Sequence, residues 1–440
     1  MSLGSNARTG DGARAGGAVA WLLYGGVRNQ LRCDEAEVVE GIAHYVMSQH
    51  ASLRRGAALV EKSRGTPLPS VAALLGAATR FLEVRADGRQ GGAVWVARLG
   101  NERRAVEPLL ELTPELSWSE LKFRRRPDAA GLSALTRVRL RDVRRILRLA
   151  RRLHRRQEFF KALRAVELVG YYARYLQLFR RGRYRLALMS SHSNPHGIAF
   201  NLAARRCGVP VALVTHGMPV RPVARLSYDL SVVHCEAARQ TYVEEGCRMG
   251  RVLVHGRRQD YAPMPAGPMP ARLSVGVFLC KDVNEGRLRA LAENLLADAR
   301  VARVTVRPHP KNLWLGLDEW IASRNDPRLT RARGGSVFDD LRATDIVLAG
   351  NSSVFVDAVT AGRPAAFVAG IDHGSPDLHA FVARGLIYQF DDDTGFDPEE
   401  MLRFYQRADW PGVLRLFANV DEDEASVAAR FADAIRLLCT

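Results

Sequence analysis

Short apolar runs and helical patterns alternate along the chain from about residue 186 onward. Most of the apolar runs are followed within two residues by Gly, Pro, Asn, Ser or His, and a segment whose apolar positions have helical spacing follows most of them. This alternation predicts an α/β fold with parallel sheets. The predicted strands are residues 186–189, 209–214, 230–233, 252–254, 274–280, 304–306, 345–348, 365–368 and 386–388.

The first part of the chain has fewer strand signals. Residues 19–24 and 93–97 are apolar runs that predict strands, and residues 57–84 have a mostly helical pattern. Residues 130–181 carry two long helical patterns, which predict a helical insertion in the N-terminal half.

A proline-rich stretch divides the chain. Residues 262–271 hold four prolines in ten positions, which is typical of a stiff, extended linker. We therefore predict a flexible leader at 1–17, Rossmann-like domains at 18–261 and 272–424, and a C-terminal helix at 425–440. Two domains suit a chain of 440 residues, and two Rossmann-like domains are expected to face a cleft.

Composition favours a cytoplasmic globular protein. The chain is 47% hydrophobic and 25% charged, as soluble domains are. No apolar run approaches the roughly 20 residues of a membrane-spanning helix. The six cysteines are scattered, with neither C-x-x-C spacing nor a dense disulfide pattern, so a reducing compartment is expected.

The net charge of +17 is concentrated in one segment. Residues 122–156 contain 14 basic residues and two acidic ones. This stretch predicts a basic helix that makes peripheral contact with anionic membrane or with a polyanionic acceptor. The alternative is a solvated face in an arginine-rich chain, in which only five of the 64 basic residues are lysine. Nucleic acid is not expected, because aromatic stacking residues do not interrupt the basic stretch.

A cationic loop follows the predicted strand at 304–306: Arg307-Pro308-His309-Pro310-Lys311. The two prolines restrict the backbone around the imidazole, the guanidinium can bind a phosphate bidentately, and the ammonium adds a point charge. Lys281 follows the predicted strand at 274–280 in the same way. These residues predict a phosphate site, and the alternative is an ordinary turn with surface charges.

A second polar loop follows the predicted strand at 345–348: Gly350-Asn351-Ser352-Ser353. A helix begins directly after it, so its hydroxyl groups and free N–H groups can bind an anion. Asp357 in this helix is a candidate for a ribose hydroxyl. The alternative is a common helix cap, since Ser and Asn are standard capping residues. Ligands of parallel α/β sheets bind outside the carboxyl ends of the strands, where both loops lie.

Histidines follow the predicted strands of the N-terminal half: His192, His196 and His216, with Asp229 and Glu236 nearby. They are candidates for a general base that deprotonates an acceptor hydroxyl, with His216 favoured and His196 second. A metal is not expected, since no HExxH motif occurs. The alternative for each histidine is a structural role.

Three short motifs resemble those of bacterial GT-B transferases that use cytidine-activated donors: Thr215-His216-Gly217-Met218-Pro219, Arg307-Pro308-His309-Pro310, and residues 345–357. These transferases include CDP-glycerol glycerophosphotransferases and capsule sialyl- and Kdo-transferases with HP and SS motifs. The resemblance covers about residues 190–370. It implies that His309, Ser352 and Ser353 contact the donor phosphates and that His216 lies on the acceptor side. Thr215 and G-N-S-S replace the aromatic residue and D-Y-S-S of the glycerophosphotransferases, which favours a CMP-sugar.

We therefore expect a metal-independent glycosyltransferase with no cofactor beyond its nucleotide-sugar co-substrate. Its acceptor would be a bacterial surface polysaccharide or a lipid-linked glycoconjugate, and it would work in the cytoplasm or on the inner face of the membrane. The alternatives are a CDP-glycerol- or ribitol-type polyol-phosphate transferase, a UDP-sugar 2-epimerase, and a non-enzymatic basic protein that binds membrane or nucleic acid.

Overall fold

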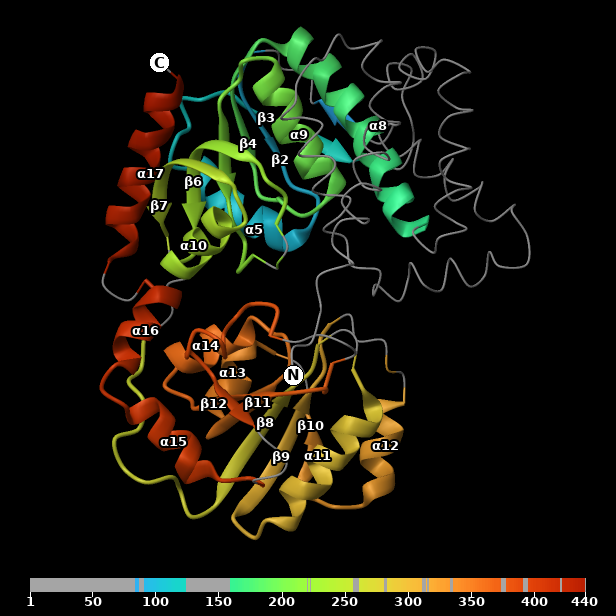
Figure 1. Ribbon diagram of the computed structural model, residues 1–440, viewed down its shortest axis with the longest axis vertical. Coiled ribbons are helices and arrows are strands. Elements are labelled where there is room, and N and C mark those ends of the chain that lie inside the picture. The colour runs from blue at the N-terminus through green and yellow to red at the C-terminus, as the bar shows by residue number, and fades with distance from the viewer. Residues whose placement is uncertain are drawn as a thin grey trace, which may run out of the picture. The chain divides into compact units, whose positions relative to one another are not determined.

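The computed structural model describes residues 84–123 and 159–439, apart from short gaps at 87–90, 220, 222, 256–260, 281–282, 311–313, 315, 333–334, 373–376, 391–394 and 420–421. Its contacts divide the chain into two compact units (Figure 1). The first unit comprises residues 1–233, 239–254 and 423–440, and the second comprises 234–238 and 255–422.

The first unit contains a mainly parallel sheet with helices. Its described strands are β1 (Val84–Ala86), β2 (Gly92–Val96), β3 (Trp118–Phe123), β4 (Tyr184–Met189), β5 (Val211–Val214), β6 (Ser227–Val233) and β7 (Arg248–Val254). They are ordered β1-β3-β2-β4-β5-β6-β7, and only the β1–β3 pair among them is antiparallel. The helices are α5 (Gly100–Leu110), α8 (Phe159–Gly182), α9 (Pro195–Arg206), α17 (Glu424–Cys439) and most of α10 (Glu236–Glu244), whose first three residues are assigned to the second unit.

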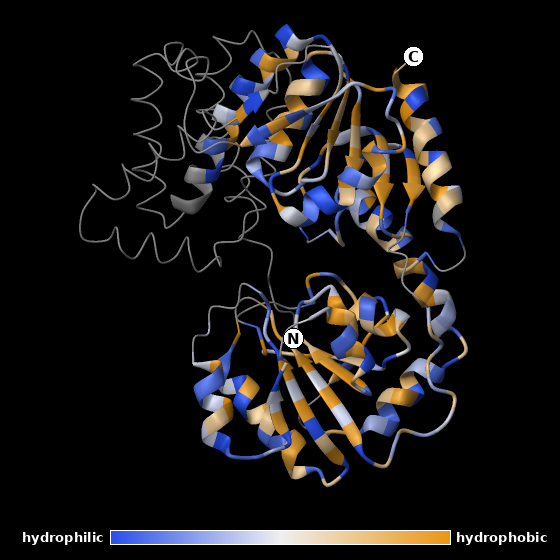
Figure 2. Cartoon of the chain, turned by 180° about the vertical axis from the view of Figure 1, so that it is seen from behind, coloured by the Kyte–Doolittle hydropathy of each residue, from blue (hydrophilic) through white to orange (hydrophobic). Residues whose placement is uncertain are grey.

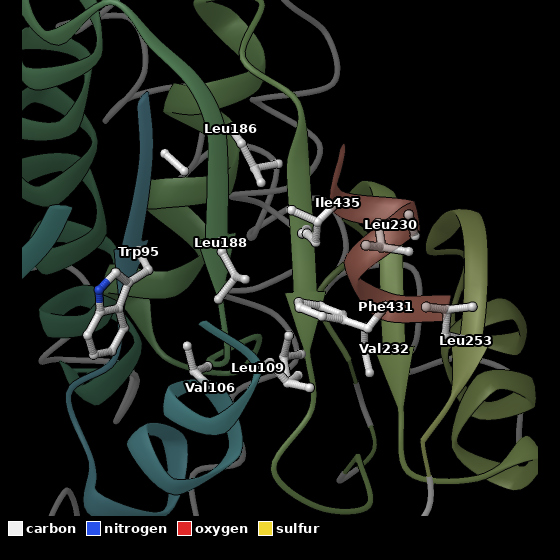
Figure 3. Close-up of a cluster of buried hydrophobic side chains, with 14 of the residues drawn as sticks. Trp95, Val106, Leu109, Leu186, Leu188, Leu230, Val232, Leu253, Phe431 and Ile435 are labelled. Atoms are coloured by element: carbon white, nitrogen blue, oxygen red, sulfur yellow. The ribbon is translucent and has the colours of Figure 1, made fainter. Parts of the chain in front are cut away.

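Helix α17 completes the core of the first unit, although it lies at the far end of the chain. Its buried side chains Phe431 and Ile435 belong to one cluster with Leu230 and Val232 of β6 (Figure 3). A surface ion pair, Arg436 Nε to Glu115 Oε1 at 2.8 Å, also joins α17 to this unit. Burial of large aliphatic and aromatic side chains stabilises this arrangement by about 1.5–3 kcal/mol each.

The second unit contains a sheet whose described strands are all parallel. They are β8 (Leu273–Phe278), β9 (Val301–Arg307), β10 (Leu329–Arg331), β11 (Ile346–Ala349), β12 (Ala365–Val368) and β13 (Tyr388–Phe390). Their order is β10-β9-β8-β11-β12-β13, which is the Rossmann order 3-2-1-4-5-6 in chain sequence. The helices are α11 (Glu285–Ala297), α12 (Leu317–Arg324), α13 (Val337–Arg342), α14 (Val354–Thr360), α15 (Pro398–Gln406) and α16 (Trp410–Phe417).

This strand order indicates one place where a ligand can bind in the second unit. From β8 the chain adds β9 and then β10 on one side of β8. It then returns to the other side of β8 and adds β11, β12 and β13, so the direction in which strands are added reverses between β8 and β11. At such a switch point the loops after the two strands diverge and leave a crevice outside their carboxyl ends. Both strands are fully apolar where they pair, as a sheet covered on its two faces requires.

The predicted α/β fold class with two Rossmann-like units is confirmed. The strand expected at 19–24, the helical pattern before residue 84 and most of the basic helix at 122–156 lie outside the described residues. The second helical pattern of 130–181 forms α8. The predicted domain boundaries and the cleft stay predictions. Within the described part of the chain, no helix is long and apolar enough to span a membrane.

Candidate functional site

The loops after β8 and β11 contact each other at the switch point of the second unit. Phe278 at the end of β8 pairs with Ala349 at the end of β11. Two residues beyond each strand, the thiol of Cys280 donates a hydrogen bond to the carbonyl oxygen of Asn351 over 3.0 Å. The G-N-S-S loop therefore begins next to the loop in which Lys281 lies, and Lys281 itself is outside the described residues.

Gly350 and Asn351 build the turn after β11. The Asn351 N–H donates to Asp372 Oδ2 at 2.5 Å, and its side-chain oxygen accepts the Leu378 N–H at 2.8 Å. A Cβ atom on Gly350 would lie 2.0 Å from Asp372 Oδ2, so only glycine fits beside this carboxylate. Asp372 was not predicted, because the only sequence signal for it is a carboxylate shortly after a predicted strand.

The two serines of this loop have different surroundings. The Ser352 hydroxyl accepts the N–H of Val354 at 3.3 Å and so helps to begin α14. Ser353 is exposed, and its side chain makes no capping hydrogen bond. Asp357 is buried in α14, with 7% of its surface exposed. Ser353 is therefore the better placed of the two hydroxyls to meet a ligand.

Arg307 is already engaged within the protein. Its guanidinium forms an ion pair with Asp340 of α13 and donates hydrogen bonds to the carbonyl oxygens of Gly335 at 3.0 Å and Ser336 at 3.4 Å. Partial burial lowers the pKa of Arg307 from its ordinary value. Because Asp340 compensates its charge, Arg307 holds the start of α13 against the end of β9.

His309 and Pro310 follow β9 directly. The backbone carbonyl of Arg307 accepts the N–H of Leu279 at 2.9 Å, so this loop starts beside the loop after β8. His309 is half-buried and Pro310 is exposed, while Lys311 lies outside the described residues. The loop with His309 therefore lies on one side of β8, and the loop with Ser352 and Ser353 lies on the other side.

In the first unit, His216 lies at the carboxyl end of β5 and contacts the end of β4. Its Nδ1 is 3.2 Å from the Ser190 hydroxyl and 3.3 Å from the Ser190 carbonyl oxygen. A carbonyl oxygen can only accept, so an N–H on Nδ1 satisfies this pairing and leaves Nε2 as the basic nitrogen. His216 is partly exposed, as a base that meets a substrate must be.

His192 lies next to His216 but is buried. Its Nδ1 is 2.8 Å from the Tyr242 hydroxyl. Burial, with a smaller effect of His216, lowers the pKa of His192 to about 3. His192 is therefore neutral at pH 7 and packs as a structural residue.

His196 is an interior residue of the first unit, with 1% of its surface exposed. Its ring contacts the rings of Phe123 and Tyr171 edge to face, with centroids at 5.1 and 6.1 Å. Neither ring nitrogen has a hydrogen-bond partner among the described residues. Burial, followed by the charges of Arg98 and Arg164, lowers the pKa of His196 to about 3. Such a ring is neutral and enclosed, so it is a poorer candidate than His216 for proton transfer with a substrate.

Comparisons with known proteins give no family. No family model matches the chain, and no curated protein matches it.

Among the described residues, no group of three or more His, Cys, Asp or Glu side chains is placed to hold a metal.

Solved structures with a similar arrangement have low sequence identity. The calicheamicin glycosyltransferase CalG4 is 14% identical, with 80% of this chain and 98% of that chain covered and a TM-score of 0.48. The lipopolysaccharide outer core galactosyltransferase WaaB is 12% identical, with 79% and 99% covered and a TM-score of 0.44. UDP-GlcNAc 2-epimerase from Neisseria meningitidis, bound to UDP-GlcNAc, is 10% identical, with 79% and 99% covered and a TM-score of 0.43.

Proposed function

We propose that this chain is a GT-B-type glycosyltransferase that moves a sugar from a nucleotide-activated donor, CMP-linked, to a bacterial surface polysaccharide or glycoconjugate without a metal ion. The observation that carries this proposal is the Rossmann strand order of the second unit, with polar loops on both sides of its switch point. Nucleotides bind at this position of such sheets.

The second unit is proposed to bind the donor. His309 and the exposed hydroxyl of Ser353 come from the two loops that start beside β8, and both group types bond phosphate oxygens. Lys281 and Lys311 are proposed to add positive charge. Gly350, Asn351 and Arg307 shape these loops, since their polar groups already have partners in the protein. Asp357 is proposed to support the start of α14.

The first unit is proposed to bind the acceptor and to provide the base. The acceptor hydroxyl attacks the anomeric carbon, the bond from that carbon to the donor phosphate breaks, and the proton passes to Nε2 of His216. Ser190 fixes the tautomer of His216 through Nδ1. Charge develops on the leaving phosphate, where His309 and the cationic side chains would stabilise it electrostatically. The basic segment 122–156 is proposed to bring the enzyme to anionic lipid near a lipid-linked acceptor.

A transfer assay with mass detection tests this function. The full chain is incubated with a CMP-sugar, a UDP-sugar or CDP-glycerol, with and without a saccharide acceptor and in the presence of EDTA. We expect an acceptor whose mass rises by one sugar with the CMP-sugar. Addition of glycerol phosphate would indicate a polyol-phosphate transferase instead. An isomerised UDP-sugar formed without acceptor would indicate an epimerase.

Two variants and one control separate the proposed roles. We expect His216→Gln and Ser353→Ala to lower the transfer rate at least tenfold, since loss of a base or of a transition-state hydrogen bond typically has such an effect. Ser323→Ala in α12 is the control, because that serine only bonds the Trp320 carbonyl in its own helix. Full activity of His216→Gln would remove the proposed base.

A further inference from the structure

One face of the second sheet is polar at β9 and β10. Along β9, Val304 and Val306 are buried, whereas Arg303 is exposed and Thr305 is half-buried. Strands of a parallel sheet that is covered on both faces are apolar throughout, as β11 and β12 are. The alternation in β9 therefore indicates that one face of the sheet is in contact with solvent here. In Figure 2 the strands of this sheet are in view, and helices cover only part of them.

A groove of about 920 Å³ lies over this polar face. It is lined by Arg303, Thr305, Thr330, Arg331, Ala332, Asp340, Ala343 and Thr344. Thr305 and Thr330 are direct neighbours in the β9–β10 register, and their hydroxyl oxygens are 3.3 Å apart. One hydroxyl donates to the other, so the pair retains one donor and further acceptor capacity for a ligand.

Arg303 differs from the other arginines near this groove. Arg307 pairs with Asp340, and Arg331 pairs with Asp318. For Arg303 we find no carboxylate within ion-pair distance in the part of the chain that the structure describes. Among the described residues of its lining, the groove therefore has one guanidinium without an ion-pair partner beside a pair of hydroxyls, and the carboxylate of Asp340 is paired with Arg307.

We propose that this groove binds an oxyanion carried on a hydroxylated ring, such as a sugar phosphate. A guanidinium matches the geometry of a phosphate and binds it through two parallel hydrogen bonds. The two threonines offer the donors and acceptors that sugar hydroxyls require. The volume exceeds that of a single ion and lies within the range of small-molecule sites.

This groove is distinct from the donor site proposed above. Arg303 lies four residues before Arg307 along β9, and four strand residues span about 13 Å. The groove therefore lies over the face of the sheet at Arg303, Thr305 and Thr330. Its lining includes none of the residues proposed to contact the donor phosphates, although Asp340 at its edge pairs with Arg307. Binding of a ligand in this groove does not require glycosyl transfer, so it can be tested without an activity assay.

Titration of the full chain with glucose 6-phosphate at constant ionic strength, followed by backbone amide NMR, tests the proposal. We expect saturable shifts of Thr305, Thr330 and Ala332, and no comparable shifts with glucose. Arg303→Gln should weaken binding about tenfold or more, which is the typical effect of losing a hydrogen bond to a charged group. Thr330→Val, which keeps the shape but removes one hydroxyl, should weaken it severalfold.

Arg272→Gln is the matched control, because Arg272 is an exposed arginine of the same unit outside the groove lining. It should bind glucose 6-phosphate within twofold of the unaltered protein. Three outcomes overturn the proposal: no saturable binding, equal binding of glucose and its phosphate, or unchanged affinity of Arg303→Gln. All these variants replace exposed or half-buried side chains, so we expect them to fold. The same spectra show whether each variant is folded.

Discussion

Gly350→Ala is expected to destabilise the second unit by about 2.5–6 kcal/mol. The added Cβ would lie 2.0 Å from Asp372 Oδ2 and 2.5 Å from its Cγ, where about 3.4–4 Å is normal contact. The φ of Gly350 lies outside the left-handed region, so the effect is steric. Overpacking typically costs about 1–3 kcal/mol. Displacing Asp372 also breaks its hydrogen bond with the Asn351 N–H, which adds about 1.5–3 kcal/mol.

Urea unfolding monitored by circular dichroism measures this change. Gly267→Ala is the control, since nothing lies within 4 Å of a Cβ at that position. In an Asp372→Ala background the clashing carboxylate is gone, and the additional effect of Gly350→Ala should fall to half or less. A Gly350→Ala protein within about 0.5 kcal/mol of the unaltered one, as an ordinary surface substitution would be, would refute the contact between Gly350 and Asp372.

Two further predictions concern the first unit. His196 has its pKa lowered to about 3 in the folded state against about 6.5 when unfolded, so the unfolded state binds the proton first as pH falls. Because of this group, the free energy of unfolding should fall by about 2 kcal/mol between pH 7 and pH 5. In His196→Gln the fall over the same pH range should be smaller by that amount. An unchanged slope would contradict the buried neutral imidazole. Phe431→Ala in α17 should cost about 3–5 kcal/mol in a denaturation experiment, whereas Arg436→Ala should cost less than about 1 kcal/mol. Equal effects of the two would mean that α17 does not pack into the core.

Most strands of the second unit could be predicted from the sequence because they are short apolar runs that end in polar turns. Strand β10 (Leu329–Arg331) was not predicted, because two of its three residues are polar. The run at residues 365–368 corresponds to β12 without a shift. Strand β3 was not predicted, since Ser119, Glu120 and Lys122 interrupt its apolar pattern. The helix predicted at 425–440 corresponds to α17, but periodicity does not say against which sheet a helix packs.

The candidate site was predictable in its position and less so in its contacts. Strand ends and polar loops indicated where His309, Ser353 and His216 would lie. No sequence pattern indicates that Asp340 neutralises Arg307, because that partner lies in another element 33 residues away. Burial of His196 was equally hidden, since the rings that enclose it come from β3 and α8.

Isothermal titration of CMP, CDP and UDP into the full chain tests the proposed function most directly. We expect saturable binding of a cytidine nucleotide without added metal, weaker binding of UDP, and about tenfold or greater loss of affinity in Ser353→Ala or His309→Ala. Ser323→Ala should bind as the unaltered protein does. Absence of binding by all three nucleotides would contradict a nucleotide-dependent function for the switch point between β8 and β11.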